Sequence, residues 1–188
     1  MAECILVVDD QLSNREMFAD ALKAWGYKPV VAQDGFDALR KIAEHAPSLV
    51  ISDLKMQPMS GFELLSVLAR RFPTLPLICV SAEYDPADLP RHVVCDILLR
   101  KGHYEMSELR AKVSELLLRG PHREQLFNRR QTLPWIPKHR TGDYVITCTN
   151  CLRAFPTPGT TETQHASEHT RCVYCQTALH YFIEGSSK

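Results

Sequence analysis

"CILVVDD", residues 4–10, places two adjacent aspartates directly after five apolar residues. An apolar run without polar alternation predicts a strand that is buried on both faces, as in a parallel sheet. Two like charges at the end of such a strand are costly unless something cationic lies beside them. The stretch therefore predicts a parallel sheet whose edge holds a cation.

The first 118 residues repeat this alternation of short apolar runs and amphipathic segments. Five strands alternating with five helices predict a doubly wound α/β fold, with helices on both faces of a five-stranded parallel sheet. Ser13 and Glu16 are spaced as a capping box, and Gly26 is placed to end the first helix. The predicted strands are residues 4–9, 28–33, 48–53, 76–82 and 96–100. The predicted helices are residues 13–26, 34–45, 60–72, 85–94 and 104–120.

The charge distribution divides the chain into three parts. Lys plus Arg equals Asp plus Glu, 22 each. The net charge therefore gives no reason to expect an electrostatic field that attracts nucleic acids or membranes. Residues 119–142 nevertheless hold six basic residues and one acid, with several prolines. We therefore expect an acidic domain at 1–119, a basic linker at 120–142 and a small domain at 143–188. Because no signal peptide or membrane-spanning run is evident, we expect a cytoplasmic protein.

Polar residues end four of the five predicted strands. Because parallel strands present their carboxyl ends at one edge, these side chains are expected to converge. Carboxylates that hold Mg²⁺, an ammonium group and a hydroxyl together make a phosphoryl-transfer site with one Asp as nucleophile. Taken singly, each could instead be an ordinary helix cap or strand end. The residues are Asp9, Asp10, Asp53, Ser81 and Lys101.

Residues 1–119 resemble a receiver domain of the response-regulator family. The resemblance rests on "LVVDDQ", "LVISDLKMQPMSGFEL", "LICVSA" and "LLRKGHY", in family order. It implies that Asp53 accepts a phosphoryl group from a sensor histidine kinase or phosphotransfer protein, without turnover as an enzyme. It also implies that Asp10, Asp53 and the Lys55 carbonyl bind Mg²⁺, with Asp9 acting through water. Ser81 and Lys101 would then contact the new phosphoryl group.

Three positions depart from the family pattern. Gly102 follows Lys101 where the family usually has proline, and Leu98 replaces a common aromatic residue. The proline after the acceptor is displaced to Pro58. The residues expected to carry out phosphoryl transfer match the family pattern, whereas those expected to transmit the signal differ from it. A phosphorylation-independent scaffold is therefore the alternative to a working acceptor.

Four of the seven cysteines form two Cys-x₂-Cys pairs separated by 20 residues. Four thiolates in two chelating pairs predict a tetrahedral structural Zn²⁺ site, and residues 143–188 resemble a zinc ribbon. A Cys2His2 site with His165 and His169 and a redox dithiol are the alternatives. The pairs are Cys148 with Cys151 and Cys172 with Cys175; Cys4, Cys79 and Cys95 are expected to be core residues.

The zinc ribbon has too few basic residues to favour nucleic acid, so we expect it to contact a protein target. Nucleic-acid binding through the ribbon and the basic linker is the alternative, using Arg129, Arg130, Lys138 and Arg140. Phosphorylation is expected to shift an equilibrium at the face of the fourth and fifth helices. That face would pair with a second receiver, giving a homodimer, or dock the linker. Trp135 either tethers the linker to a neighbour or belongs to a strap that covers a local apolar patch.

Overall fold

The computed structural model describes residues 2–84, 94–121, 135–136, 144–157 and 167–183. The first part is an α/β domain and the last two ranges form a small β module. The strands of the first part are β1 (Cys4–Val8), β2 (Lys28–Ala32), β3 (Leu49–Asp53), β4 (Leu77–Ser81) and β5 (Ile97–Arg100). Its helices are α1 (Leu12–Ala24), α2 (Gly35–His45), α3 (Gly61–Arg71) and α4 (Met106–Arg119). The remaining strands are β6 (Trp135–Ile136), β7 (Tyr144–Thr147), β8 (Ala154–Thr157), β9 (Ser167–Arg171) and β10 (Ala178–Ile183).

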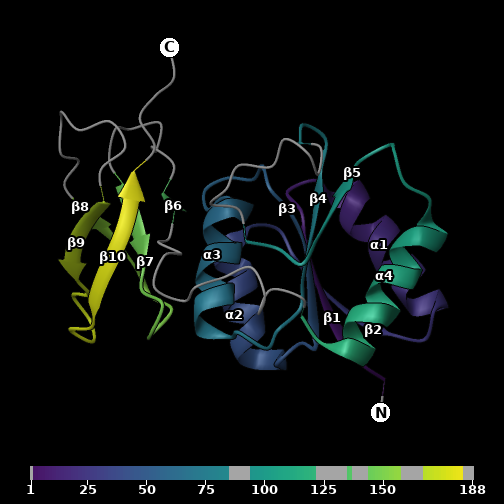
Figure 1. The fold of residues 1–188 in the computed structure, drawn as a ribbon, viewed down its shortest axis with the longest axis horizontal. Helices are drawn as coiled ribbons and strands as arrows, with labels where there is room; N and C mark the ends of the chain where they lie inside the picture. Colours follow the sequence, from purple (N-terminus) through teal and green to yellow (C-terminus); the bar gives the residue numbers. More distant parts are fainter. Residues whose placement is uncertain (1, 85–93, 122–134, 137–143, 158–166, 184–188) are drawn as a thin grey trace.

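The five strands of the α/β domain form one parallel sheet in the order β2-β1-β3-β4-β5. Helices α2 and α3 cover one face, and α1 and α4 cover the other (Figure 1). Every residue of β3 and β4 is buried, because side chains from both faces of these strands enter a core cluster. The predicted doubly wound, five-stranded parallel sheet is therefore confirmed.

One of the two predicted features at the ends of α1 is confirmed, and α2 and α3 each begin with a side-chain cap. Asp34 caps α2 and Ser60 caps α3 by accepting a hydrogen bond from a backbone N–H of the first turn. Gly26 follows α1 with a φ of +88°, a conformation that glycine adopts without strain. The predicted Ser13 cap is wrong, because α1 begins at Leu12 and its N-cap Gln11 makes no side-chain capping bond.

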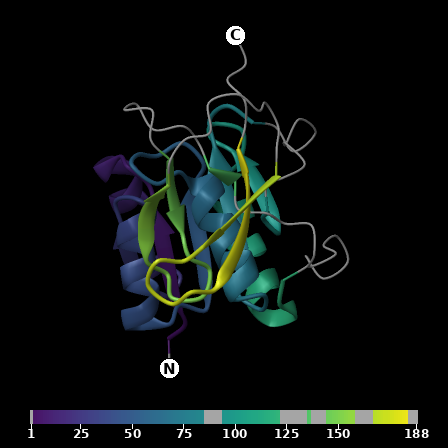
Figure 2. The same ribbon diagram turned by 90° about the vertical axis from the view of Figure 1, so that its left-hand side faces the viewer.

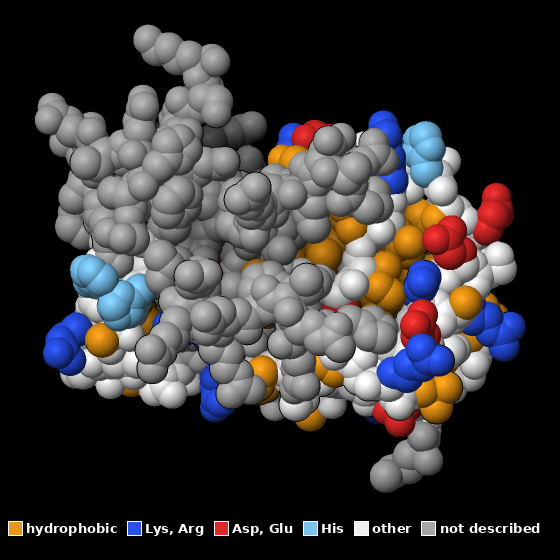
Figure 3. All heavy atoms as spheres, viewed as in Figure 1, with side chains coloured by type: hydrophobic (Ala, Val, Ile, Leu, Met, Phe, Trp, Pro, Cys, Tyr) orange, Lys and Arg blue, Asp and Glu red, His pale blue; other side chains and the backbone are white. Residues whose placement is uncertain are grey.

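The fourth predicted helix, at 85–94, falls almost entirely outside the described residues. The described helices include none that is long and apolar enough to cross a membrane. Figure 3 shows acidic and basic side chains interspersed over the described part of the α1 and α4 side, without one dominant sign.

The C-terminal module contains a three-stranded sheet in the order β6-β10-β9 and the hairpin β7-β8. We call residues 144–157 and 167–183 the Cys4 module. The two residues of β6 come from the predicted linker and pair in parallel with β10. The linker residue Trp135 therefore joins the sheet of the module.

The Cys4 module lies against the α2–α3 side of the α/β domain, away from α1 and α4 (Figures 1 and 2). Thr147, at the end of β7, contacts Met59 and Glu63. Leu152 packs against the core cluster that lies under α2 and α3. The two parts are therefore in direct contact through buried side chains.

Candidate functional site

The aspartates that follow β1 and the aspartate that ends β3 meet at the carboxyl edge of the sheet, as predicted. Carboxylate oxygens of Asp9, Asp10 and Asp53 all lie within 4.8 Å of one another. Asp9 and Asp53 are buried, whereas Asp10 is exposed. Parallel pairing of β1 with β3 places these ends side by side, so the convergence is a consequence of strand register.

Lys101, directly after β5, reaches across the edge to two of these carboxylates. Its Nζ donates to Asp53 Oδ2 at 2.6 Å and to Asp9 Oδ2 at 2.9 Å. Burial raises the pKa of Asp53, and the hydrogen bond and charge of Lys101 partly offset this. Burial lowers the pKa of Lys101, but its bonds to Asp53 and Asp9 outweigh this, so its pKa is raised. The ammonium group is therefore held charged among the carboxylates.

Asp9 has further partners that the sequence did not reveal. Its Oδ1 accepts from the Gln11 N–H at 2.9 Å and from Asn14 Nδ2 at 3.1 Å. Arg15 donates to the backbone carbonyl of Asp9 at 2.6 Å. These donors lie at the start of α1, so the helix holds the Asp9 carboxylate in place. The "QLSN" sequence after Asp10 was the available signal, because a polar residue one turn into a helix can reach back to its start.

Ser81, the last residue of β4, and Lys55, in the loop after β3, lie at the same edge. Ser81 is buried at the end of β4, and its Oγ accepts from the Glu83 N–H at 3.2 Å. The Lys55 N–H donates to Asp53 Oδ1 at 3.2 Å. The Lys55 ammonium pairs with Glu83, which lies two residues after Ser81. The role of the Lys55 carbonyl as a metal ligand stays a prediction.

The start of α3 is packed against the backbone of Asp53. The Gly61 N–H donates to the Leu54 carbonyl at 3.0 Å. A Cβ at Gly61 would lie 1.8 Å from the Asp53 carbonyl oxygen, so only glycine fits here. In the loop between Asp53 and Gly61, the Gln57–Pro58 peptide is cis. In the loop after β5, the Lys101–Gly102 peptide is trans and Gly102 has a φ of +79°.

The donor set of the three aspartates fits Mg²⁺. Oxygens around an octahedral Mg²⁺ lie about 2.1 Å from the ion, and so about 3 to 4 Å from one another. The carboxylate oxygens here lie within 4.8 Å of one another, so small side-chain rotations suffice. Hard oxygen ligands of this kind are those that Mg²⁺ prefers.

The four paired cysteines also converge. Their Sγ atoms all lie within 4.8 Å, and two cross-pair distances, Cys148 to Cys175 and Cys151 to Cys172, are both 3.6 Å. Sulfurs around a tetrahedral Zn²⁺ at about 2.3 Å lie about 3.8 Å apart. The geometry fits the zinc site predicted from the spacing.

The two cysteine turns have the same backbone geometry. In each, the first Sγ accepts the N–H two residues on at 3.4 Å, from Asn150 and from Tyr174. Each first carbonyl accepts the N–H four residues on at 2.9 Å, from Leu152 and Gln176, which have φ values of 58° and 60°. N–H groups directed at sulfur favour thiolates, which are the form that binds metal.

The histidines considered as alternative ligands lie elsewhere or outside the described residues. His169 in β9 lies opposite His180 in β10 in the sheet. Their exposed rings pack edge to face, with 4.3 Å between the ring centroids. His165 is outside the described residues. Cys79 is buried in the α/β core, and Cys4 and Cys95 are partly buried in that domain.

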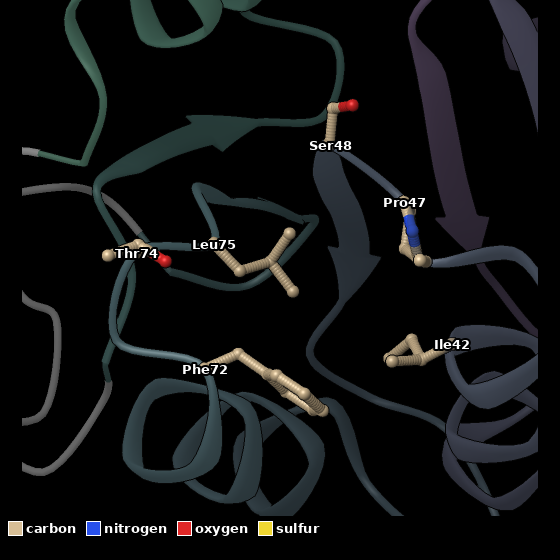
Figure 4. Close-up of a pocket in the computed structure, with 7 residues that line it drawn as sticks. Ile42, Pro47, Ser48, Phe72, Thr74 and Leu75 are labelled. Carbon is tan, nitrogen blue, oxygen red and sulfur yellow. The ribbon is translucent and has the colours of Figure 1, made fainter.

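A pocket of about 340 Å³ opens at the opposite edge of the sheet, before β3 and β4. Figure 4 shows the side chains of Ile42, Phe72 and Leu75 converging on it. Its apolar lining and its position separate it from the carboxylate cluster, so we assign it no part in the chemistry.

A parallel α/β sheet with aspartates and a lysine at its carboxyl edge defines the class of receiver-like signalling domains. The family model described as "Response regulator receiver domain" matches residues 5–99. The chain belongs to this family.

Two curated relatives and two solved structures illustrate the match. "Transcriptional regulatory protein ZraR" of Klebsiella oxytoca is 36% identical over 78 residues, 42% of this chain and 18% of the relative. "Sensor histidine kinase RcsC" of Salmonella typhimurium is 41% identical over 78 residues, 42% of this chain and 8% of that protein. The chain thus aligns with less than a fifth of either relative's length.

The two structures match the α/β domain. Chemotaxis protein CheY4 of Vibrio cholerae has a TM-score of 0.56 at 26% identity, over 61% of this chain and 98% of its own. Response regulator TrrA of Thermotoga maritima, solved with Mg²⁺-BeF, has a TM-score of 0.55 at 31% identity, over 61% and 98%. Neither match extends over the whole of this chain.

Proposed function

We propose that this chain is a two-component response regulator that accepts a phosphoryl group on Asp53 and carries a zinc-bound C-terminal output module. The observation that carries the proposal is the contact of Lys101 Nζ with both Asp53 and Asp9 at the sheet edge. A cation held between two carboxylates lies where the oxygens of a transferred phosphoryl group need neutralising.

The transfer uses the Asp53 carboxylate as nucleophile. One of its oxygens forms a bond to phosphorus while the P–N bond of a phosphohistidine breaks, and the electron pair of that bond stays on the imidazole nitrogen. Lys101 moves from the carboxylate to the phosphoryl oxygens, and the Ser81 hydroxyl donates to another. Asp9, Asp10, Asp53 and the Lys55 carbonyl would hold Mg²⁺, which would supply positive charge to the phosphoryl oxygens.

A sensor histidine kinase or phosphotransfer protein is the proposed donor. The chain holds one stoichiometric acceptor, so we expect at most slow self-dephosphorylation rather than turnover. The similarity to a segment of a named sensor histidine kinase and to a regulator supports a place in two-component signalling.

The Cys4 module is the proposed output, with Zn²⁺ held by Cys148, Cys151, Cys172 and Cys175. Its described core is small, so metal binding is expected to supply much of its stability. Val173 and Tyr174, at the tip of the second cysteine turn, are more than half exposed. An exposed apolar tip of this kind offers a contact for a protein target.

The test is phosphorylation by acetyl phosphate with and without Mg²⁺. We expect the wild-type protein to gain one phosphoryl group in the presence of Mg²⁺, and Asp53→Asn to gain none. A folded wild-type protein that gains none would favour the phosphorylation-independent scaffold.

A further inference from the structure

The site around Asp53 and the Cys4 module share one structural element, the first turn of α3. On one side, Gly61 begins this helix in backbone contact with the acceptor residue. A Cβ on Gly61 would lie 1.8 Å from the Asp53 carbonyl oxygen, so the two backbones are already in close contact. A displacement of the Asp53 backbone must therefore displace the start of α3.

On its other side, the same turn contacts the module. Thr147 Oγ1 lies 3.3 Å from Glu63 Oε1 and 4.0 Å from Met59 Sδ. Met59 immediately precedes the helix cap Ser60, and Glu63 is the residue whose N–H that cap accepts at 3.2 Å. Thr147 is the residue before Cys148, a proposed zinc ligand. One helical turn thus lies between the acceptor and the zinc site.

The contact between Glu63 and Thr147 is desolvated. Glu63 is 4% exposed and Thr147 is 2% exposed. Burial raises the pKa of Glu63 to about 8, and hydrogen bonds from the Thr147 side chain and backbone only partly offset it. Since a buried carboxyl that loses its partner is strongly disfavoured, a small displacement of this turn has a large effect on docking.

A second path by which phosphorylation could affect the rest of the domain runs through β5. Along this path the chain departs from the family pattern at Leu98 and Gly102. Leu98 is only 9% exposed and packs in the core cluster under α2 and α3. Leu98 also lacks the aromatic ring that is common at this position in the family. Gly102 adopts a φ of +79°, and a Cβ there would contact nothing within 4 Å. The backbone carbonyl of the acceptor residue, by contrast, lies directly against the start of α3.

Lys101 Nζ donates to Asp53 Oδ2 at 2.6 Å, at the residue whose backbone carbonyl lies against Gly61. Phosphorylation converts that carboxylate to an acyl phosphate and draws Lys101 away from it. Loss of the Lys101 bond is expected to move the Asp53 backbone, and with it the tightly packed turn on which the module docks.

We propose that phosphorylation of Asp53 loosens the docking of the Cys4 module on the first turn of α3, through Gly61, Met59 and Glu63. This rests on the proposed phosphoacceptor function. By linkage, the docked module must weaken phosphoryl binding by the same factor by which phosphorylation weakens docking.

The test is hydrogen exchange of the full-length, zinc-loaded protein with Mg²⁺, before and after addition of beryllofluoride as a phosphoryl analogue. We expect exchange in residues 144–157 to accelerate by about 5-fold or more, a typical coupling between sites. Asp53→Asn should not respond.

Two variants sharpen the test. Thr147→Val removes the hydroxyl that contacts Glu63, so exchange at the interface should already be fast and beryllofluoride affinity should rise by the same factor. Ser66→Ala, in the same helix, removes a buried hydroxyl without a hydrogen-bond partner and should respond like the wild type. The wild-type measurement stands alone if Thr147→Val loses zinc.

Beryllofluoride protection at residues 53–60 together with unchanged exchange at 144–157 would overturn the coupling while leaving the phosphoacceptor function intact. No response at residues 53–60 would reject the phosphoacceptor function, and the coupling with it.

Discussion

Lys101 Nζ lies 2.6 Å from Asp53 Oδ2 and is also bonded to Asp9, so one ammonium group serves two buried carboxylates. These bonds join Lys101 to Asp9, which lies 92 positions away in the sequence, and to Asp53, which lies 48 positions away. The contact balances like charges at the edge where the fold brings strand ends together.

Lys101→Met removes this balance. We expect it to lower the free energy of unfolding by about 2 kcal/mol without Mg²⁺, because two buried carboxylates lose their cation. Mg²⁺ should restore more stability to the variant than to the wild type. Urea unfolding with and without Mg²⁺ measures both, and Lys112→Met, in an exposed pair with Glu115, should change stability by less than about 0.5 kcal/mol. Equal stability of Lys101→Met and wild type without Mg²⁺ would contradict this account.

Gly61→Ala tests the contact between α3 and the acceptor backbone. The new Cβ would overlap the Asp53 carbonyl oxygen, so the helix must shift and we expect a loss above about 3 kcal/mol. Gly102→Ala, which meets open space at positive φ, should cost only about 1 kcal/mol. Thermal unfolding compares the two, and similar losses would show that Gly61 is not tightly packed.

Glu63 predicts a pH dependence of stability. Its pKa is about 8 in the structure and near 4.5 when solvated, so the folded state holds the proton more tightly. This contribution is complete below about pH 4.5 and is lost as pH rises through about 8. Between pH 6 and 8 the wild type should lose about 2 kcal/mol relative to Glu63→Gln, which cannot ionise. Parallel urea-unfolding profiles of the two proteins against pH would reject the buried, proton-bearing Glu63.

The Cys4 cluster predicts stoichiometric zinc. Metal analysis should find one Zn²⁺ per chain in the wild type and none retained by Cys148→Ser after dialysis against a chelator, because the closed four-thiolate site is lost. Cys4→Ser, a cysteine of the α/β domain, should keep its zinc. A metal-free wild type with a folded C-terminal module would instead support the redox alternative.

The sequence predicts features that arise from local pattern or simple topology. Apolar runs without alternation place β1 and β3, and the rule that parallel strands share an edge brings Asp9 and Asp53 together. The Cys-x₂-Cys spacing predicts the cysteine cluster for a similar reason, since each turn chelates locally.

Other features depend on contacts far apart in the sequence. Glu63 at the third position of a capped helix looks like a solvent-exposed capping residue. Its burial depends on Thr147, 84 positions later, and no local pattern encodes that contact. The Ser13 capping prediction is wrong because α1 begins one residue earlier, at Leu12, and residues at its start bond Asp9.

The central claim is that Asp53 carries the phosphoryl group. Sodium borohydride reduces an acyl phosphate of aspartate to homoserine, and peptide mass spectrometry locates that residue. After treatment with acetyl phosphate and Mg²⁺, we predict homoserine at position 53 and not at Asp9 or Asp10. Homoserine at another aspartate, or none in a phosphorylated protein, would contradict the account.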